Sequence, residues 1–131
     1  MIEIVNQKDI RSLLKINRIF MNIDKQYGPP PKWRREQGFI SLSKIILEQQ
    51  VSLASANAHY LKLNHNLKEF SPTEILKLTD DEMRNCQISR QKTKYLRALS
   101  IAIIEKKIDL EQSAKFSSAQ IRKQLTSTKG I

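Results

Sequence analysis

Residues 39–61 constrain the fold most strongly, because two apolar patterns with helical spacing follow one another there. Gln49, Gln50 and Val51 separate the two patterns, and Ser52 is placed to begin the second helix. Two adjacent amides at a helix junction suit a partner that offers both hydrogen-bond donors and acceptors, as nucleobases do. The apolar residues that we expect to face the core are Phe39, Leu42, Ile45 and Ile46 in the first helix and Leu53, Ala54, Ala56 and Tyr60 in the second.

The composition favours an all-α fold. Of 131 residues, 40% are hydrophobic, while only three are Gly and four are Pro, which leaves little turn chemistry for a sheet. This length suits one compact domain with a buried core. We therefore expect a compact multi-helix bundle that forms a single helical domain over residues 1–131.

The formal net charge is +10, which favours partners that carry phosphate or acidic lipid. The densest basic run consists of Arg90, Lys92, Lys94 and Arg97. A solvated helix face explains many runs of this kind, so the run by itself favours DNA binding only weakly.

Cys86 is the only cysteine, so the chain cannot form an internal disulfide, a thiolate zinc site or an iron–sulfur cluster from its own residues. We expect Cys86 to pack as a small buried apolar group. The sequence contains neither a signal peptide pattern nor a run of about 18 apolar residues. A cytoplasmic, nucleoid-associated location is therefore expected.

Capping residues predict the other helices. Asn6 with Asp9 is placed to open a first helix that continues to about Gln26. Four later segments carry the same kind of signal, and we expect helix starts at Ser71, Thr79, Ser89 and Ser117, the helix from Ser89 reaching about Lys107. Because capping explains the acids that follow Thr79, we do not interpret them as a metal or catalytic site.

Two segments resemble a known family. They are the run Ile-Leu-Glu-Gln-Gln-Val-Ser-Leu-Ala-Ser-Ala from Ile46 to Ala56 and the Ser-Arg-x-Lys-x-x-Tyr-Leu string within residues 88–96. Both resemble the helix-hairpin-helix (HhH-GPD) DNA glycosylase superfamily, and most closely its bacterial 3-methyladenine DNA glycosylase II branch. The resemblance extends over nearly the whole chain. It implies an all-α glycosylase fold, double-stranded DNA with a damaged base as partner, and no cofactor or metal.

The resemblance also implies roles for particular residues. Gln50 would wedge into the duplex where the damaged base leaves, with Gln49 supporting the loop, although both could simply cap a helix end. Arg90 and Lys92 would attract or orient the DNA backbone at a helix N-terminus. The residues that remain are Lys129 and Gly130, which would begin the hairpin that binds a DNA phosphate, and Trp33 and Arg34, which would lie on the substrate side unless Trp33 covers the core.

The chemistry that the resemblance implies requires a carboxylate near an oxocarbenium-like transition state. In the family that Asp lies beyond the hairpin, so we expect no catalytic residue in this chain. The sequence would then be the N-terminal part of a base-excision N-glycosylase for alkylated purines, ending in the first half of the hairpin. Two alternatives stay open: a non-catalytic, basic helical DNA-binding remnant, and a helical interaction protein whose basic surface serves only solubility.

Overall fold

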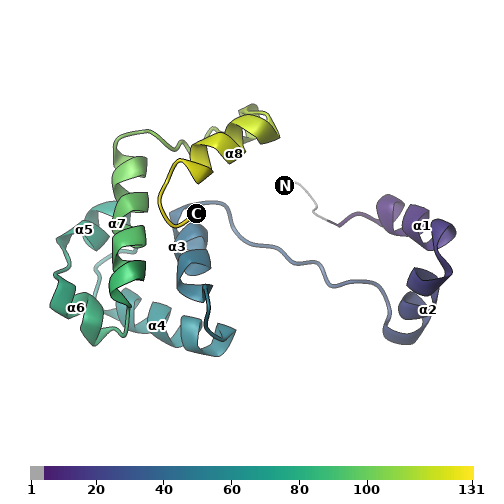
Figure 1. The fold of residues 1–131 in the computed structure, drawn as a ribbon, viewed down its shortest axis with the longest axis horizontal. Helices are drawn as coiled ribbons and strands as arrows, with labels where there is room; N and C mark the ends of the chain where they lie inside the picture. The colour runs from purple at the N-terminus through teal and green to yellow at the C-terminus, as the bar shows by residue number, and fades with distance from the viewer. Residues whose placement is uncertain (1–4) are drawn as a thin grey trace. The chain divides into compact units, whose positions relative to one another are not determined.

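A computed structural model describes residues 5–131, and every regular element in that part of the chain is a helix (Figure 1). The predicted all-α class is confirmed. The chain separates into two compact units, Met1–Glu36 and Gln37–Ile131. The single domain expected for residues 1–131 therefore stays a prediction.

The first unit contains two short helices, α1 (Gln7–Ile16) and α2 (Arg18–Tyr27), where the sequence predicted one continuous helix. The start of α1 is as predicted, because the Asn6 side chain accepts a hydrogen bond from the Asp9 N–H at 2.8 Å. The predicted continuity is wrong at Asn17, whose backbone is extended and whose side chain accepts from an N–H two residues later. An Asn side chain competes with helical backbone bonds in this way, so it ends one helix and caps the next.

A glycine ends α2, close to the predicted helix end near Gln26. Gly28 has φ 79°, a left-handed conformation that favours glycine, and its N–H donates to the Asp24 carbonyl at 2.8 Å. The prolines that follow lead the chain away from the helix without regular structure.

The second unit is a bundle built around one long helix. Its elements are α3 (Phe39–Glu48), α4 (Leu53–His65), α5 (Pro72–Lys77), α6 (Asp80–Asn85), α7 (Arg90–Ile104), the 3-10 helix η1 (Ser113–Lys115) and α8 (Ser118–Thr126). Helix α7 packs against α3, α5 and α6, while α3 also packs against α4 (Figure 1). The described helices include none that is both long enough and apolar enough to cross a membrane.

The core of this unit consists of apolar side chains that α7 gathers from its neighbours. Leu96 and Leu99 of α7 are fully buried. Cys86 is 2% exposed, which confirms the expected apolar packing. Complete burial of one such leucine side chain is worth about 1.5–3 kcal/mol. The other fully buried apolar residues are Ile46, Leu47, Leu63, Ile75 and Met83.

The predicted core stripe is correct in part. Ile46 and Ala56 are buried, and Phe39, Leu42 and Tyr60 pack against the core partly buried. The predictions for Ile45 (42% exposed), Leu53 (69% exposed) and Ala54 were wrong. Consecutive helical residues differ by about 100° around the axis, so Ile45 lies about 200° from Leu47 and falls outside the face that Ile46 and Leu47 share. The side chain of Leu53 emerges at the helix junction, where no neighbouring helix covers it within the described unit.

The predicted caps of this unit are present. Ser52, Ser71, Thr79, Ser89 and Ser117 each accept a hydrogen bond from the N–H three residues later. Thr79 and Ser117 form capping boxes, because the side chain three residues later accepts a hydrogen bond from the N–H of the cap residue in return. Helix α7 ends at Ile104, before the predicted end near Lys107.

At Ser71 the capping is one-sided. Glu74 donates its N–H to Ser71, but its carboxylate pairs with Lys77. The ammonium of a nearby lysine competes successfully for this carboxylate because a charge-assisted bond is stronger than one to a neutral N–H.

Candidate nucleic-acid interface

The corner between α3 and α4 presents Gln50 in an unusual backbone conformation. Gln49 ends α3, and Ser52 caps α4 with its hydroxyl 3.1 Å from the Ser55 N–H. Between them Gln50 is exposed and has φ 57°, in the left-handed region that side chains other than glycine seldom occupy. Such a conformation costs on the order of 1–3 kcal/mol and is common at binding sites. The predicted break at residues 49–51 is confirmed.

A hydrogen bond joins this corner to the segment after α8. The Gln49 amide donates through Nε2 to the Gly130 carbonyl at 2.8 Å. Gly130 has φ 98°, and a Cβ at this position would lie 2.3 Å from Cγ of Tyr95. Only glycine therefore allows the chain to pass this close to α7. The structure brings the corner residues Gln49 and Gln50 to Gly130, and Lys129, which precedes Gly130, is exposed.

Lys92 supports the same corner from α7. Its ammonium donates to the Leu47 carbonyl at 2.7 Å, in the last turn of α3. Carbonyl groups at a helix C-terminus have no partner within the helix and attract a cation. Partial burial lowers the pKa of Lys92 below its ordinary value, because desolvation disfavours the charged form. The role of Lys92 toward DNA stays a prediction, and its observed contact holds α3 against α7.

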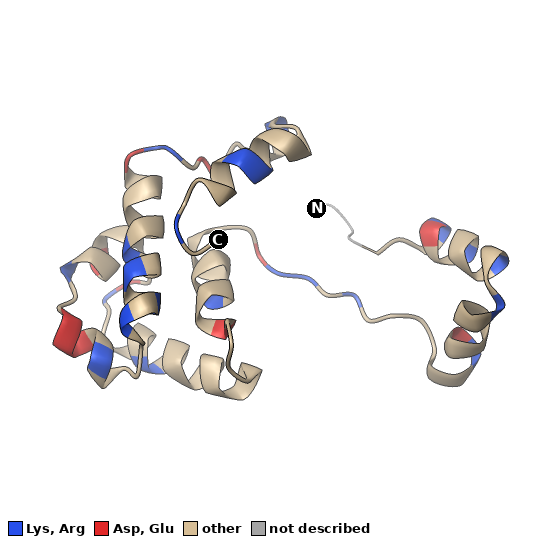
Figure 2. Ribbon diagram, in the orientation of Figure 1, with Lys and Arg blue, Asp and Glu red and all other residues tan. Residues whose placement is uncertain are grey.

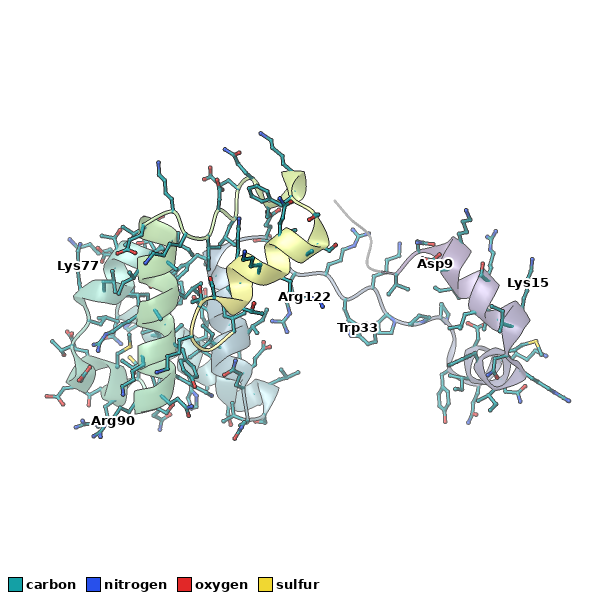
Figure 3. All side chains as sticks on the ribbon, turned by 45° about the horizontal axis from the view of Figure 1, so that its top comes forward. Asp9, Lys15, Trp33, Lys77, Arg90 and Arg122 are labelled. Carbon is teal, nitrogen blue, oxygen red and sulfur yellow. The ribbon has the colours of Figure 1, made fainter. Side chains whose placement is uncertain are left out.

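The basic run of α7 divides into two kinds of side chain. Arg97 bonds to the Asp80 carboxylate at 2.5 Å and to the Leu78 carbonyl at 2.9 Å, so it fastens α7 to the start of α6 and to the end of α5. Arg90, labelled in Figure 3, and Lys94 are exposed. Figure 2 shows basic positions along the N-terminal half of α7. Only part of the run is therefore presented to a partner.

A cavity of about 390 Å³ lies between the corner and the N-terminal end of α7. Its lining is rich in amides, and no Asp or Glu is among the described side chains that form it. The lining residues on which the site depends are Gln49, Gln50, His59, Gln87, Gln91 and Tyr95. A cavity of this kind offers hydrogen-bond donors and acceptors without negative charge.

Sequence reasoning identified only part of this cavity. It named Gln49, Gln50 and Lys92 but assigned no site to His59, Gln87 or Gln91. The helix starts predicted at Thr79 and Ser89 imply a turn shortly before Ser89, and this turn, which contains Gln87, is the signal that could have drawn attention to it.

Trp33 and Arg34 belong to the first unit. Trp33 is 67% exposed, and no side chain of α1 or α2 is buried. Figure 3 labels Trp33 in this unit. The substrate-side role implied for Trp33 and Arg34 stays a prediction.

Two solved structures share this fold. A DNA-3-methyladenine glycosidase from Bacillus halodurans matches with a TM-score of 0.79 and 21% identity, over 99% of this chain and 60% of its own. A 3-methyladenine DNA glycosylase from Schizosaccharomyces pombe, in complex with abasic DNA, matches with a TM-score of 0.81 and 23% identity, over 95% of this chain and 64% of its own. The chain thus spans less than two thirds of the length of either structure. No curated protein matches the chain.

The family profile described as "HhH-GPD superfamily base excision DNA repair protein" matches residues 43–128. This segment extends from the buried face of α3 to the turn after α8 and contains the corner, the cavity and α7. The chain therefore belongs to the HhH-GPD superfamily of base excision DNA repair proteins.

Proposed function

We propose that this chain binds double-stranded DNA that contains a damaged base, as part of a DNA N-glycosylase for alkylated purines such as 3-methyladenine. The observation that carries the proposal is the exposed, left-handed Gln50 at a corner that the Gln49–Gly130 hydrogen bond holds in place. The names of the two similar structures, both 3-methyladenine glycosylases, support the substrate class. This function would place the chain in the cytoplasm, in association with the nucleoid.

The physical role of Gln50 follows from the cost of displacing a nucleotide. Extruding a base leaves a gap in the stack and costs a few kcal/mol. A side chain that enters this gap offsets part of the cost. The fixed corner presents Gln50 with little further loss of backbone entropy, while the net charge of +10 supplies general attraction to phosphate.

We assign no catalytic role to any residue of this sequence. Cleavage of the glycosidic bond requires a carboxylate that stabilises positive charge on the sugar. No Asp or Glu is among the described residues that line the cavity beside Gln50. This observation favours a second candidate function, a basic helical module that binds DNA without cutting the glycosidic bond.

The test compares duplexes with and without an abasic site, which presents a gap for Gln50 to fill. By fluorescence anisotropy we expect the chain to prefer the abasic duplex about tenfold, which corresponds to about 1.4 kcal/mol. Gln50→Ala should reduce this preference to about twofold or less. The affinity for intact duplex should change little, because the contacts of the protein with the DNA backbone remain.

Gln112→Ala is the matched control, because Gln112 is also an exposed glutamine but lies outside the cavity. It should retain the full preference. If Gln50→Ala keeps the full preference for the abasic duplex, the wedge role of Gln50 is contradicted and only the DNA-binding module remains. If binding to both duplexes is insensitive to salt, both functions are contradicted.

A further inference from the structure

A groove of about 470 Å³ lies between α6 and the N-terminal half of α7. Helices α6 and α3 pack on opposite sides of α7, so this groove opens away from the corner between α3 and α4 (Figure 1). Among the described residues its lining has four cationic side chains, one carboxylate and no aromatic ring. The lining residues that carry the argument are Asp80, Arg84, Ile88, Arg90, Thr93, Lys94 and Arg97.

The groove and the cavity at the corner use different faces of α7. The residues that α7 contributes are Gln91, Lys92 and Tyr95 to the cavity and Arg90, Thr93, Lys94 and Arg97 to the groove. Since consecutive residues are about 100° apart, the centres of these two sets lie roughly 150° apart around the helix axis. A duplex that receives Gln50 at the corner would therefore meet the side of α7 that is remote from the groove.

The groove keeps positive charge after its internal ion pairs are formed. Arg97 is paired with Asp80, and its side chain is 30% exposed. Arg84 is paired with Asp81 at 3.2 Å. Each pair uses only part of the five donors of a guanidinium group. The two other cations of the lining, Arg90 and Lys94, make no ion pair with a described residue, so they are open to an anionic partner.

Thr93 is the residue that a merely solvated basic face does not explain. It is 4% exposed and lines the groove, yet its hydroxyl makes no hydrogen bond with any described residue. On the same helix, the buried Ser100 hydroxyl donates to the Leu96 carbonyl at 2.7 Å. Buried hydroxyl groups without a partner are rare and costly. Thr93 therefore offers a donor to a ligand in the groove, and the nearby N-terminus of α7 favours an anion there.

The lining suits the carboxylates of a polypeptide better than a nucleic acid. Single strands bind by stacking their bases on aromatic side chains, which the described lining lacks. Asp80 lies in the groove, so a continuous row of phosphates would meet negative charge there. Carboxylates can be spaced to avoid it, and arginine binds them through paired hydrogen bonds. Ile88 provides an apolar contact for a neighbouring side chain of the peptide.

We propose that the groove between α6 and α7 binds an acidic segment of a partner protein. Thr93 donates its hydroxyl to one carboxylate of this segment, and the surrounding cations contact the others. The inference does not rest on the proposed function, because the groove faces away from the corner that carries Gln50. The chain would then hold a protein partner and DNA on different sides of one helix.

The test uses the full chain and a short fluorescein-labelled peptide of Asp, Glu and Leu, with a counterpart in which Asn and Gln replace the acids. By fluorescence anisotropy we expect the acidic peptide to bind at least about tenfold more tightly. Thr93→Val should weaken this binding about tenfold, because it removes a hydrogen bond to a charged group and keeps the side-chain shape. The Tm of this variant should not fall, since the hydroxyl has no partner in the free protein.

Two lysine variants show whether the groove or the overall charge binds the peptide. Lys94→Gln should weaken binding about threefold, the effect of losing one exposed ion pair. Lys123→Gln is the matched control, because Lys123 is also exposed on a helix but lies outside the groove. It should leave the affinity nearly unchanged. Equal losses in both lysine variants, with full binding in Thr93→Val, would identify general charge attraction and overturn the inference.

Competition with duplex DNA separates this inference from the proposed function. At about 0.15 M salt, saturation with the abasic duplex should lower the peptide affinity by no more than about twofold. Thr93→Val should leave the duplex affinity unchanged. If it weakens duplex and peptide binding equally, the groove belongs to the DNA surface and the inference is overturned. Equal affinity for the acidic and neutral peptides would also overturn it, while a missing preference for abasic duplex would contradict only the proposed function.

Discussion

The two units are both built from capped helices but differ in what they bury. In the first unit, α1 and α2 each have ten residues and an Asn cap, and none of their residues is buried. In the second unit, α7 buries five of its residues and packs against α3, α5 and α6. Large apolar side chains of the first unit, such as Ile16 at 81% exposed, do not enter a core within that unit.

This difference shows that a helix pattern and a buried core are separate properties. Caps and amphipathic spacing specify where a helix forms, and both units have these features. Isolated helices shorter than about 12–15 residues are only marginally stable in water, and packing supplies most of their stability in proteins. We therefore expect the second unit to carry nearly all of the folding free energy that these helices contribute.

The largest expected effect comes from removing a buried leucine. Leu96→Ala should lower the free energy of unfolding by about 2–5 kcal/mol, because it leaves a cavity between fully buried neighbours. Leu13→Ala in α1, where the side chain is 46% exposed, should cost less than about 1 kcal/mol. Urea unfolding followed by circular dichroism measures both values, and equal losses would show that the apolar face of α1 is also covered.

A smaller effect is expected at the helix caps. Ser89→Ala removes the acceptor for the Lys92 N–H and should cost about 1 kcal/mol of global stability. Asn6→Ala removes the same kind of contact from α1 but should only speed amide exchange within residues 7–16. Hydrogen exchange resolved by residue distinguishes the two results. A shift of the global unfolding transition in Asn6→Ala would show that the two units unfold as one cooperative structure.

The smallest effect concerns acid stability of the second unit. The Thr79 N–H donates to the Glu82 carboxylate at 2.7 Å, and its hydroxyl donates at 3.1 Å, so the pKa of Glu82 lies below its ordinary value of 4.5. The unfolded state therefore binds a proton first as pH falls. The stabilisation is complete well above pH 4.5 and is lost as pH falls through the folded pKa.

Glu82→Gln keeps the acceptor oxygen but does not titrate, so its stability should decline less between about pH 5 and pH 3 than that of the wild type. Urea midpoints at several pH values measure the difference. If the urea midpoints of the two proteins fall in parallel with pH, Glu82 does not contribute to the loss of stability in acid.

The sequence predicted the helices well because their signals are local. The caps Asn6, Ser52 and Ser89 each lie within one helical turn of the N–H from which they accept a hydrogen bond. The core position of Ile45 was predicted wrongly because burial depends on which helix packs against each face of α3. The break at Asn17 was not predicted because an Asn side chain can either face solvent within a helix or cap the next one. Such choices are not encoded by spacing alone.

The candidate site was predictable only where one segment carries it. The corner at Gln49 and Gln50 lies within a continuous run of sequence and was found. The cavity was missed because its far wall, with Gln87 and Gln91, is brought to the corner by packing across more than 30 residues of chain. The bond of Lys92 to the Leu47 carbonyl joins residues 45 apart and could not be inferred from a basic run.

The hydrogen bond between Gln49 and Gly130 also sets an order of events during synthesis. Its two residues are 81 positions apart, so Gln49 leaves the ribosome long before its partner exists. Local contacts form early, whereas closure of so long a loop comes late and slows folding. The helices of the second unit can be in place while the corner still lacks its last restraint. A nascent chain would then acquire its fold before it acquires a fixed Gln50.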